Sequence, residues 1–554
     1  VTPSQYPCVS MVARPVPKKE ISSNPKAKAS VDAEWEKLRK RNTWDETKPR
    51  EKRDVVREAK AANRKVHFGF IFPLCMEKGS ELPEGDPGRK MKGRVVFGGD
   101  RVTDENYESA IFNDLSSSPS TMEGAKAVDV HACLPGHIGE LADAPQAYTQ
   151  TFLLGTETWV SMDKDQWPKS WHGKFDNPVV PLLRALYGHP ESGGWWERHA
   201  EKGIFAAGFK AVPEWKSTYF HKKLKLLLTV YVDDFKMAGP KANVKEGWKL
   251  LQGIGKIELD TPTPFGKYLG CNHEVKNVKL GDILKELGTI PACIQRHIDS
   301  GHKVDMNKIV TSMVWDNRQF MEQCLSTYQA LAAKTGQKVT FKKVDTPFLD
   351  EAALLKHEND HFAPSNQNGT KSISTASSVK SASTGSNASW SSTVSSRTQS
   401  SSPAASAASS TTNTTTSKKK KGKAKKKANV QSPPGEGGIL QPIAASCLMK
   451  VLYGARMARP DLLRATCYLA RLITKWTPAC DKMLHRLMCY ISSTLDVKMQ
   501  GFIGDEFDLL SIELYSDADL ASCKATAKST SGVLIAIGGP HSFFAINWIS
   551  NKQT

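Results

Sequence analysis

A long segment rich in serine and threonine divides this chain and limits how it can fold. Of the 47 residues at 371–417, 28 are Ser or Thr, and no acidic residue occurs between His361 and Gly435. Such a composition cannot bury enough apolar surface to offset the entropy lost on ordering. We therefore expect a disordered linker at 363–436, with one folded unit on each side of it.

Eight lysines close this segment, all within residues 418–427. The 554-residue chain holds 76 Lys+Arg and 57 Asp+Glu, a net charge of +19, so 19 − 8 = +11 remain elsewhere. This balance favours a polyanionic partner, because basic side chains neutralise phosphates, although solubility alone would explain it equally well. The lysine cluster could contact nucleic acid or direct import into the nucleus, and a solvated run of charge is an equal alternative.

Cysteine usage and hydropathy bear on the compartment. The eleven cysteines are odd in number, scattered, and never form a CxxC pair, which indicates reduced thiols inside the cell. No run approaches the ~18 consecutive apolar residues of a membrane span, so we expect no membrane partner. The chain starts at Val1 and stops in mid-pattern at Thr554, which indicates a fragment.

Hydrophobic patterning predicts an α+β fold. Residues 1–31 hold five prolines and many lysines, which predicts a flexible leader. The expected strands are His67–Phe72, Arg94–Phe97, Leu224–Val232, Ser511–Tyr515 and Gly532–Ile537. The expected helices are Pro181–Leu186, Trp195–Lys202, Val244–Ile254 and a longer helical pattern through Leu448–Leu487.

Two adjacent carboxylates, Asp233 and Asp234, interrupt the most apolar of these strands, in the run KLKLLLTVYVDDFKMAG at Lys223–Gly239. The pattern predicts a hairpin with both acids at its tip. Neighbouring carboxylates repel each other unless a cation lies between them, and Mg²⁺ prefers oxygen ligands. Taken alone, two aspartates are more often an ordinary exposed turn.

The wider context of this hairpin resembles the reverse-transcriptase region of the Pol polyprotein of copia-type LTR retrotransposons. The matching segments, in chain order, are Ala33–Asp45 (AEWEKLRKRNTWD), Lys92–Val96 (KGRVV), Asp143–Tyr148 (DAPQAY), Leu186–Trp196 (LYGHPESGGWW), Tyr231–Asp234 (YVDD), Tyr268–Gly270 (YLG), Ala458–Leu462 (ARPDL), Tyr515–Ala521 (YSDADLA), Ser529–Gly532 (STSG) and Ile546–Gln553 (INWISNKQ). Each motif is weak or moderate by itself, and their common order carries the resemblance.

The resemblance implies a domain plan and an activity. It implies a reverse transcriptase of fingers, palm and thumb at 32–350, a connection segment at 438–510 and the truncated start of an RNase H-like α/β domain at 511–554. The implied activity is RNA-directed DNA polymerisation on an RNA template and a DNA primer with dNTPs. The implied locations are a cytoplasmic particle, the nucleus or both.

The resemblance also assigns site residues. Asp143, Asp233 and Asp234 would be the catalytic carboxylates that hold two Mg²⁺ ions, with Mn²⁺ as a possible substitute. Tyr148 would pack under the sugar and exclude a 2′-hydroxyl. The residues expected to contact the nucleotide or template are Tyr148, Lys92, Arg94, Tyr231 and Glu191. Without the resemblance, Lys92 and Arg94 would be read as solvated surface charges and Tyr148 as a core residue.

Some positions depart from the family pattern. Glu191 replaces the motif's glutamine, and Pro145 lies inside the first acidic motif. Asp517 matches one metal-binding acid of the RNase H region, but the chain ends before its partners would appear, so we expect no ribonuclease activity. These departures motivate a second hypothesis, a decayed or repurposed relative that binds nucleic acid without polymerising.

Two patterns formally resemble zinc sites. HENDH at His357–His361 satisfies the HExxH metalloprotease pattern, but it borders the expected linker and has no evident third ligand. Cys293, His297 and His302 are spaced like ligands as well. We interpret both patterns as incidental.

Overall fold

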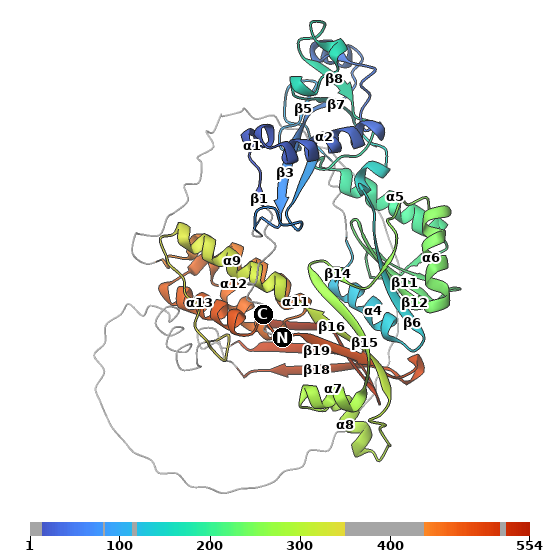
Figure 1. Ribbon diagram of the computed structural model, residues 1–554, viewed down its shortest axis with the longest axis vertical. Helices are drawn as coiled ribbons and strands as arrows, with labels where there is room; N and C mark the ends of the chain where they lie inside the picture. The colour runs from blue at the N-terminus through green and yellow to red at the C-terminus, as the bar shows by residue number, and fades with distance from the viewer. Residues whose placement is uncertain (1–13, 81–82, 113–118, 349–436, 521–527, 554) are drawn as a thin grey trace, which may run out of the picture. The chain divides into compact units, whose positions relative to one another are not determined.

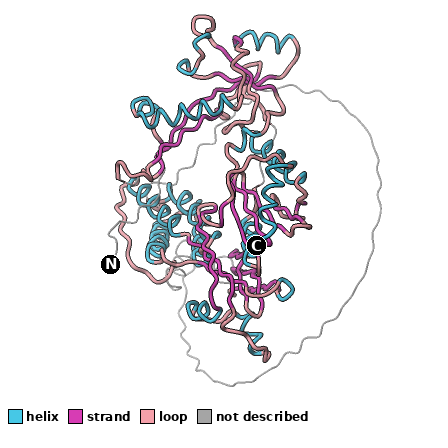
Figure 2. Tube along the Cα trace, turned by 45° about the vertical axis from the view of Figure 1, so that its right-hand side comes forward, coloured by secondary structure: helices cyan, strands magenta, loops and turns pink. Residues whose placement is uncertain are grey.

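The computed structural model describes residues 14–80, 83–112, 119–348, 437–520 and 528–553, which mix helices and strands as the α+β prediction requires (Figures 1 and 2). The predicted linker at 363–436, its lysine cluster and the HENDH pattern lie outside these residues. No helix within the described ranges is long and apolar enough to cross a membrane.

The first sheet gathers the N-terminal strands around the long strand β3. It follows the order β1-β3-β7-β8-β2, with β4 and β5 also paired to β3. Its strands are β1 (Arg14–Pro15), β2 (Arg50–Glu51), β3 (Val66–Lys78), β4 (Lys90–Phe97), β5 (Thr103–Asp104), β7 (Glu157–Ser161) and β8 (Pro178–Pro181). The same part of the chain forms three helices, α1 (Lys18–Ser23), α2 (Pro25–Lys40) and α3 (Lys52–Ala61).

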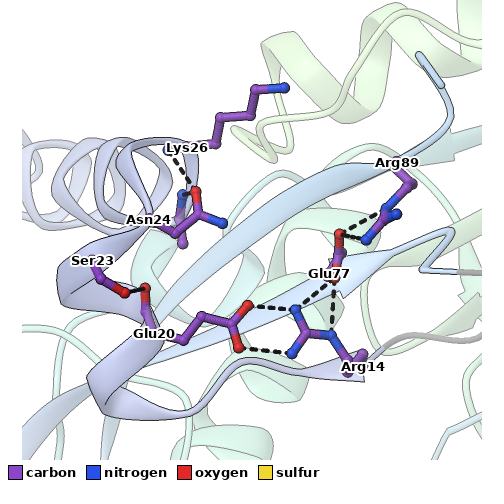
Figure 3. Close-up of polar contacts among 8 residues, drawn as sticks. Arg14, Glu20, Ser23, Asn24, Lys26, Glu77 and Arg89 are labelled. Carbon is purple, nitrogen blue, oxygen red and sulfur yellow. Dashed lines mark hydrogen bonds and ion pairs between the residues drawn. The ribbon is translucent and has the colours of Figure 1, made fainter. Parts of the chain in front are cut away.

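The prediction of a flexible leader at 1–31 is wrong for the second half of this range. Both α1 and the start of α2 lie there, and α2 buries Ala27 and Val31 along with Trp35 and Leu38. An ion-pair network holds this segment to the sheet, because Arg14 contacts Glu20 at 2.5 Å and Glu77 at 2.8 Å (Figure 3). The Glu77 side chain also accepts from Arg89 at 2.6 Å.

The second sheet is antiparallel and follows the order β13-β6-β12-β11-β10-β9. Its strands are β6 (His137–Asp143), β9 (Lys210–Ala211), β10 (Thr218–His221), β11 (Leu226–Tyr231), β12 (Asp234–Pro240) and β13 (Thr263–Pro264). Alternate side chains of β12 face opposite sides: Phe235 and Met237 pack in the core that holds α5 (Ser192–Ala206) and α6 (Lys241–Gly253). Ala238 faces α4 (Met122–Cys133) instead.

The third sheet combines strands from both sides of the serine-rich segment. Its order is β14-β15-β16-β17-β20-β19-β18. These strands are β14 (Lys267–Tyr268), β15 (Cys271–Lys279), β16 (Ile309–Asp316), β17 (Met499–Ile503), β18 (Ser511–Ala518), β19 (Thr530–Gly539) and β20 (Ser542–Lys552). The pairing of β16 with β17, in which Met313 lies opposite Gly501, joins the two portions of the chain.

Helices from both portions also share one core. These helices are α9 (Arg318–Lys334), α11 (Gln441–Met457), α12 (Leu463–Ala470) and α13 (Pro478–Ser493), and they lie together in Figure 1. Two shorter helices, α7 (Leu280–Leu287) and α8 (Ala292–Asp299), precede β16. The expectation of two separate folded units is therefore wrong, since the described residues on both sides of the serine-rich segment belong to one compact unit.

Most predicted elements are present, and one has the wrong type. The strands predicted within β3, β4, β18 and β19 and the helix predicted within α5 are confirmed. The strand predicted at Leu224–Val232 and the helix predicted at Val244–Ile254 are confirmed as β11 and α6, which end slightly before the predicted limits. Residues Pro181–Leu186 are extended instead of helical. Their backbone amides bond to distant chain: Leu182 donates to Thr158 O at 2.8 Å and Leu183 donates to Thr43 O at 2.8 Å.

Candidate active site at the β11–β12 hairpin

The predicted hairpin is present, and its turn is tight. Tyr231 pairs with Asp234, so Val232 and Asp233 are the two central residues. Val232 has a φ of 60°, in the left-handed region that a β-branched residue rarely adopts. The Trp196 indole N–H donates to Val232 O at 2.6 Å and so helps to hold this conformation. Backbone strain of this kind persists only where the surrounding structure imposes it, and it is frequent at functional sites.

Strand β6 brings the third predicted acid to the same place. Asp143, the last residue of β6, lies directly opposite Asp234 in the antiparallel register. Directly paired residues project from the same face of a sheet, so these two carboxylates share a face. The next residue, Ala144, donates its backbone N–H to Asp233 O at 2.8 Å. The fold thus unites acids that are far apart in the sequence.

The carboxyl groups influence one another's protonation. Burial is the main cause that raises the pKa of Asp234 to about 6, and the charges of Asp233 and Asp143 add to it. The pKa of Asp143 is also raised, by burial and then by Asp233 and Asp260. A cation would lower the cost of keeping all these groups ionised.

Two basic residues of β4 face this cluster. Lys92 and Arg94 both lower the pKa of Asp143 and so oppose the effect of burial. The pKa of Lys92 itself is lowered by desolvation and by Arg94, while Asp143 and Asp233 act in the opposite direction. Arg94 lies 3.6 Å from a carboxylate oxygen of Glu34. The structure therefore places both predicted cations within electrostatic reach of the acids.

Tyr148 lies beside the acids in a short helical turn, Ala147–Gln150. Its ring centroid is 4.6 Å from that of Tyr187, and the Arg94 guanidinium lies 5.2 Å from the Tyr187 centroid. Burial, with a contribution from Asp233, raises the pKa of both phenols, that of Tyr187 to about 12. Both hydroxyls are therefore protonated donors near the carboxylates at neutral pH.

Sequence reasoning missed two residues of this site. Tyr187 was included only as a letter of the LYGHPESGGWW motif. Asp260 gave no signal, because it lies in a polar loop, yet its backbone N–H donates to Asp143 O at 2.8 Å and its charge acts on the Asp143 carboxyl.

Three predicted site residues lie elsewhere. Glu191 is buried at the start of α5, where its charge acts on His67, and it is not among the charges that shift Asp143 or Asp234. Asp517 is exposed on β18, opposite Gly532 of β19 in the third sheet. Tyr231 belongs to the hairpin but lines a separate cavity with Tyr268 and other residues.

The chemistry of the three carboxylates favours a metal ion, whereas the placement of their side chains does not. Carboxylate oxygens of Asp143, Asp233 and Asp234 are the ligand type that Mg²⁺ prefers. Within the described ranges, however, no three His, Cys, Asp or Glu side chains are grouped closely enough to hold an ion. That finding also covers Cys293, His297 and His302.

Comparison of the sequence with protein-family models and with curated proteins finds no match.

Proposed function

We propose that this protein is an RNA-directed DNA polymerase of a copia-type retrotransposon. The observation that supports this most directly is the register that sets Asp143 opposite Asp234 at the end of a hairpin whose turn contains Asp233. Such an arrangement is suited to nucleotidyl transfer, which needs several carboxylates at one point. The first sheet would form the fingers, and the second sheet the palm.

In this proposal Asp143, Asp233 and Asp234 hold two Mg²⁺ ions, which when bound activate the primer 3′-hydroxyl and stabilise the leaving pyrophosphate. The raised pKa values of Asp143 and Asp234 fit a site in which the acids ionise fully only beside a cation. Binding of the ions would require the three carboxyl groups to come closer together than they are in this structure. Asp233 and Asp143 carry the main role, and Asp234 supports them.

The cations of β4 would serve the nucleotide. Lys92 and Arg94 lie near the acids, where they would neutralise the triphosphate of an incoming dNTP. Tyr148, whose ring is tilted against that of Tyr187, would lie under the sugar and exclude a 2′-hydroxyl. Replacing Tyr148 by Ala should therefore increase incorporation of UMP relative to dTMP in primer extension. The same substitution at the exposed Tyr107 is the matched control.

The deciding experiment is primer extension on poly(rA)/oligo(dT) with Mg²⁺. Asp233→Asn should abolish extension while leaving template–primer affinity nearly unchanged, since basic residues supply most of that affinity. Asp282→Asn, at an exposed position of α7, is the matched control. Extension by Asp233→Asn at the unsubstituted rate would refute the catalytic assignment.

A second candidate function is nucleic-acid binding without catalysis. It is favoured by the buried acidic residue Glu191 at the motif's glutamine position, by Pro145 close after the first acid, and by the absence of a grouped set of carboxylates among the described residues. It predicts that the unsubstituted chain binds the template–primer duplex, with affinity that falls as salt rises, yet never extends the primer.

A further inference from the structure

A cavity of about 380 Å³ lies under the hairpin, on the face of the second sheet that α4 covers. Helix α4 packs against β12 of this sheet and against β16 and β20 of the third sheet (Figure 1). The walls of the cavity come from α4, β12, β15, β16 and α11, together with Tyr231 at the end of β11. Its volume is within the range of small-molecule sites. We call it the Lys126 cavity.

The charged residues that line the Lys126 cavity do not balance. Two of its three cations are paired: Lys236 Nζ lies 2.6 Å from Asp129 Oδ1, and Arg456 Nη2 lies 3.5 Å from Glu123 Oε1. Lys126 is different. Its Nζ donates to Arg456 O at 3.3 Å and lies 3.4 Å from the centroid of the Trp548 ring. Within the described part of the chain, no carboxylate forms an ion pair with it, so its ammonium group, when protonated, is one excess positive charge.

This excess charge is nearly enclosed, because Lys126 is only 3% exposed. Burial lowers its pKa to about 7. The titratable groups around it are Glu123 and Asp129 of α4, Lys236 of β12, Cys271 and His273 of β15, and Arg456 of α11. His273 is neutral at physiological pH, since burial lowers its pKa to about 4. The carboxylates therefore do not compensate fully for the burial of the ammonium group.

Much of the remaining wall is aromatic. Tyr231, Tyr268, Trp315 and Tyr453 all line the cavity, and Tyr268 and Trp315 are buried. Flat aromatic walls favour a flat ligand ring, in stacked or edge-on contact. One enclosed cation beside such walls matches a ligand with one negative charge, whereas a phosphate monoester carries about −1.5 to −2 at neutral pH.

We propose that the Lys126 cavity binds a small planar organic anion of the aromatic carboxylate class, with its carboxylate on the Lys126 ammonium group and its ring against the tyrosines. This proposal concerns binding alone and does not depend on polymerase activity. Because Tyr231 directly precedes the strained turn at Val232, an occupant would also contact the hairpin that carries the acids.

The test is calorimetric titration of the full chain with indole-3-carboxylate, and with neutral indole-3-carboxamide as the ligand control. We expect the acid to bind at least about tenfold more tightly than the amide, and Lys126→Met to weaken binding of the acid by about tenfold or more. Lys245→Met, at an exposed position of α6, should bind as the unsubstituted chain does.

Proton linkage provides a second readout. A bound carboxylate should raise the pKa of Lys126, so binding should take up close to one proton at about pH 8 and almost none at about pH 5.5, where the free protein is already protonated. Titrations in buffers of different ionisation enthalpy measure this number directly. Equal affinity for acid and amide, unchanged binding by Lys126→Met, or no binding at ~10 mM acid would overturn the proposal.

A second variant keeps the test valid if Lys126→Met fails to fold. Arg456 is about half exposed at its side chain, and its loss leaves Glu123 unpaired at the wall of the cavity. Arg456→Gln should therefore weaken binding of the acid severalfold without affecting the amide. An unchanged affinity of Arg456→Gln for the acid would count against the proposal as well.

Discussion

Asp234 illustrates how the burial of a single carboxylate can lower the stability of a protein. Its pKa is raised to about 6 by burial and by Asp233 and Asp143. The folded state therefore holds the Asp234 proton more tightly than the unfolded state does. By linkage, the free energy of unfolding falls as pH rises from about 4 to about 6, and the deficit remains at neutral pH.

Removing this charge should stabilise the protein. With divalent cations chelated, Asp234→Asn should raise the free energy of unfolding by about 1–3 kcal/mol near pH 7 and by almost nothing near pH 4. Urea denaturation at the two pH values measures this difference. Asp345→Asn, at an exposed position in the loop after α9, should have no effect at either pH. A gain that is equal at both pH values would show that charge is not its cause.

The candidate site was only partly visible in the sequence, for reasons that individual residues make clear. Asp233 and Asp234 interrupt an apolar strand, and that pattern is local. Tyr187 and Asp260 are placed by backbone bonds to distant residues, since Tyr187 O accepts from Phe97 N at 2.7 Å and Asp260 N donates to Asp143 O. No pattern in the neighbouring sequence predicts either bond. The same holds for Lys126, whose environment comes from α4, α11 and β20.

At the scale of elements, the close packing of α2 on β4 depends on a glycine. A Cβ atom at Gly93 would lie 2.5 Å from Ser30 O and 2.8 Å from Val31 Cα, both in the backbone of α2. Gly93→Ala should therefore push α2 away and lower the free energy of unfolding by about 1–3 kcal/mol. Thermal and urea unfolding measure it. Gly253→Ala is the control, because nothing lies within 4 Å of a Cβ there.

The same helix begins with a cap that can be tested separately. The Asn24 side chain accepts from Lys26 N at 3.0 Å and from Ala27 N at 3.3 Å (Figure 3). Asn24→Ala should cost about 1 kcal/mol, measured by urea denaturation, whereas Asn24→Asp keeps an acceptor and should cost much less. Equal losses for the two variants would mean that the cap contributes little.

The elements that sequence reasoning predicted correctly have strong local periodicity, and β11 with β12 is the clearest case. The apolar stripe of α2 at Ala27, Val31, Trp35 and Leu38 also has helical spacing, but lysines and prolines surround its first half. Pro181–Leu186 has helical composition, yet its amides bond to strands and loops far away in the sequence. Long-range bonds of this kind override local propensity.

At the scale of the whole molecule, the sequence predicted the mixed α+β class. It did not predict that the portions before and after the serine-rich segment share one sheet and one core. The pairing of β16 with β17 joins residues on either side of the serine-rich segment, and no local pattern encodes which strands pair. Met321 and Tyr328 of α9 share a core with Leu448 of α11 and Leu484 of α13. This core needs both portions.

A cut in the serine-rich segment should therefore leave the protein assembled. With a site-specific protease sequence inserted after Ser400, the cleaved pieces should co-elute in size-exclusion chromatography and separate only in denaturant. The uncleaved chain supplies the reference elution volume. Separate elution of the pieces under native conditions would contradict the shared sheet and restore the model of two tethered units.

The β16–β17 pairing also has a consequence during synthesis. The last residue of β17, Ile503, is made 503 − 316 = 187 residues after the last residue of β16, Asp316. At a translation rate of about 5–20 residues per second, the nascent chain waits roughly ten to forty seconds before β16 can gain this neighbour. During that time the ribosome-bound chain exposes one open strand edge and half of a helical core. Chaperone dependence in the cell should therefore centre on this interval, and slower codons within the serine-rich segment would lengthen it.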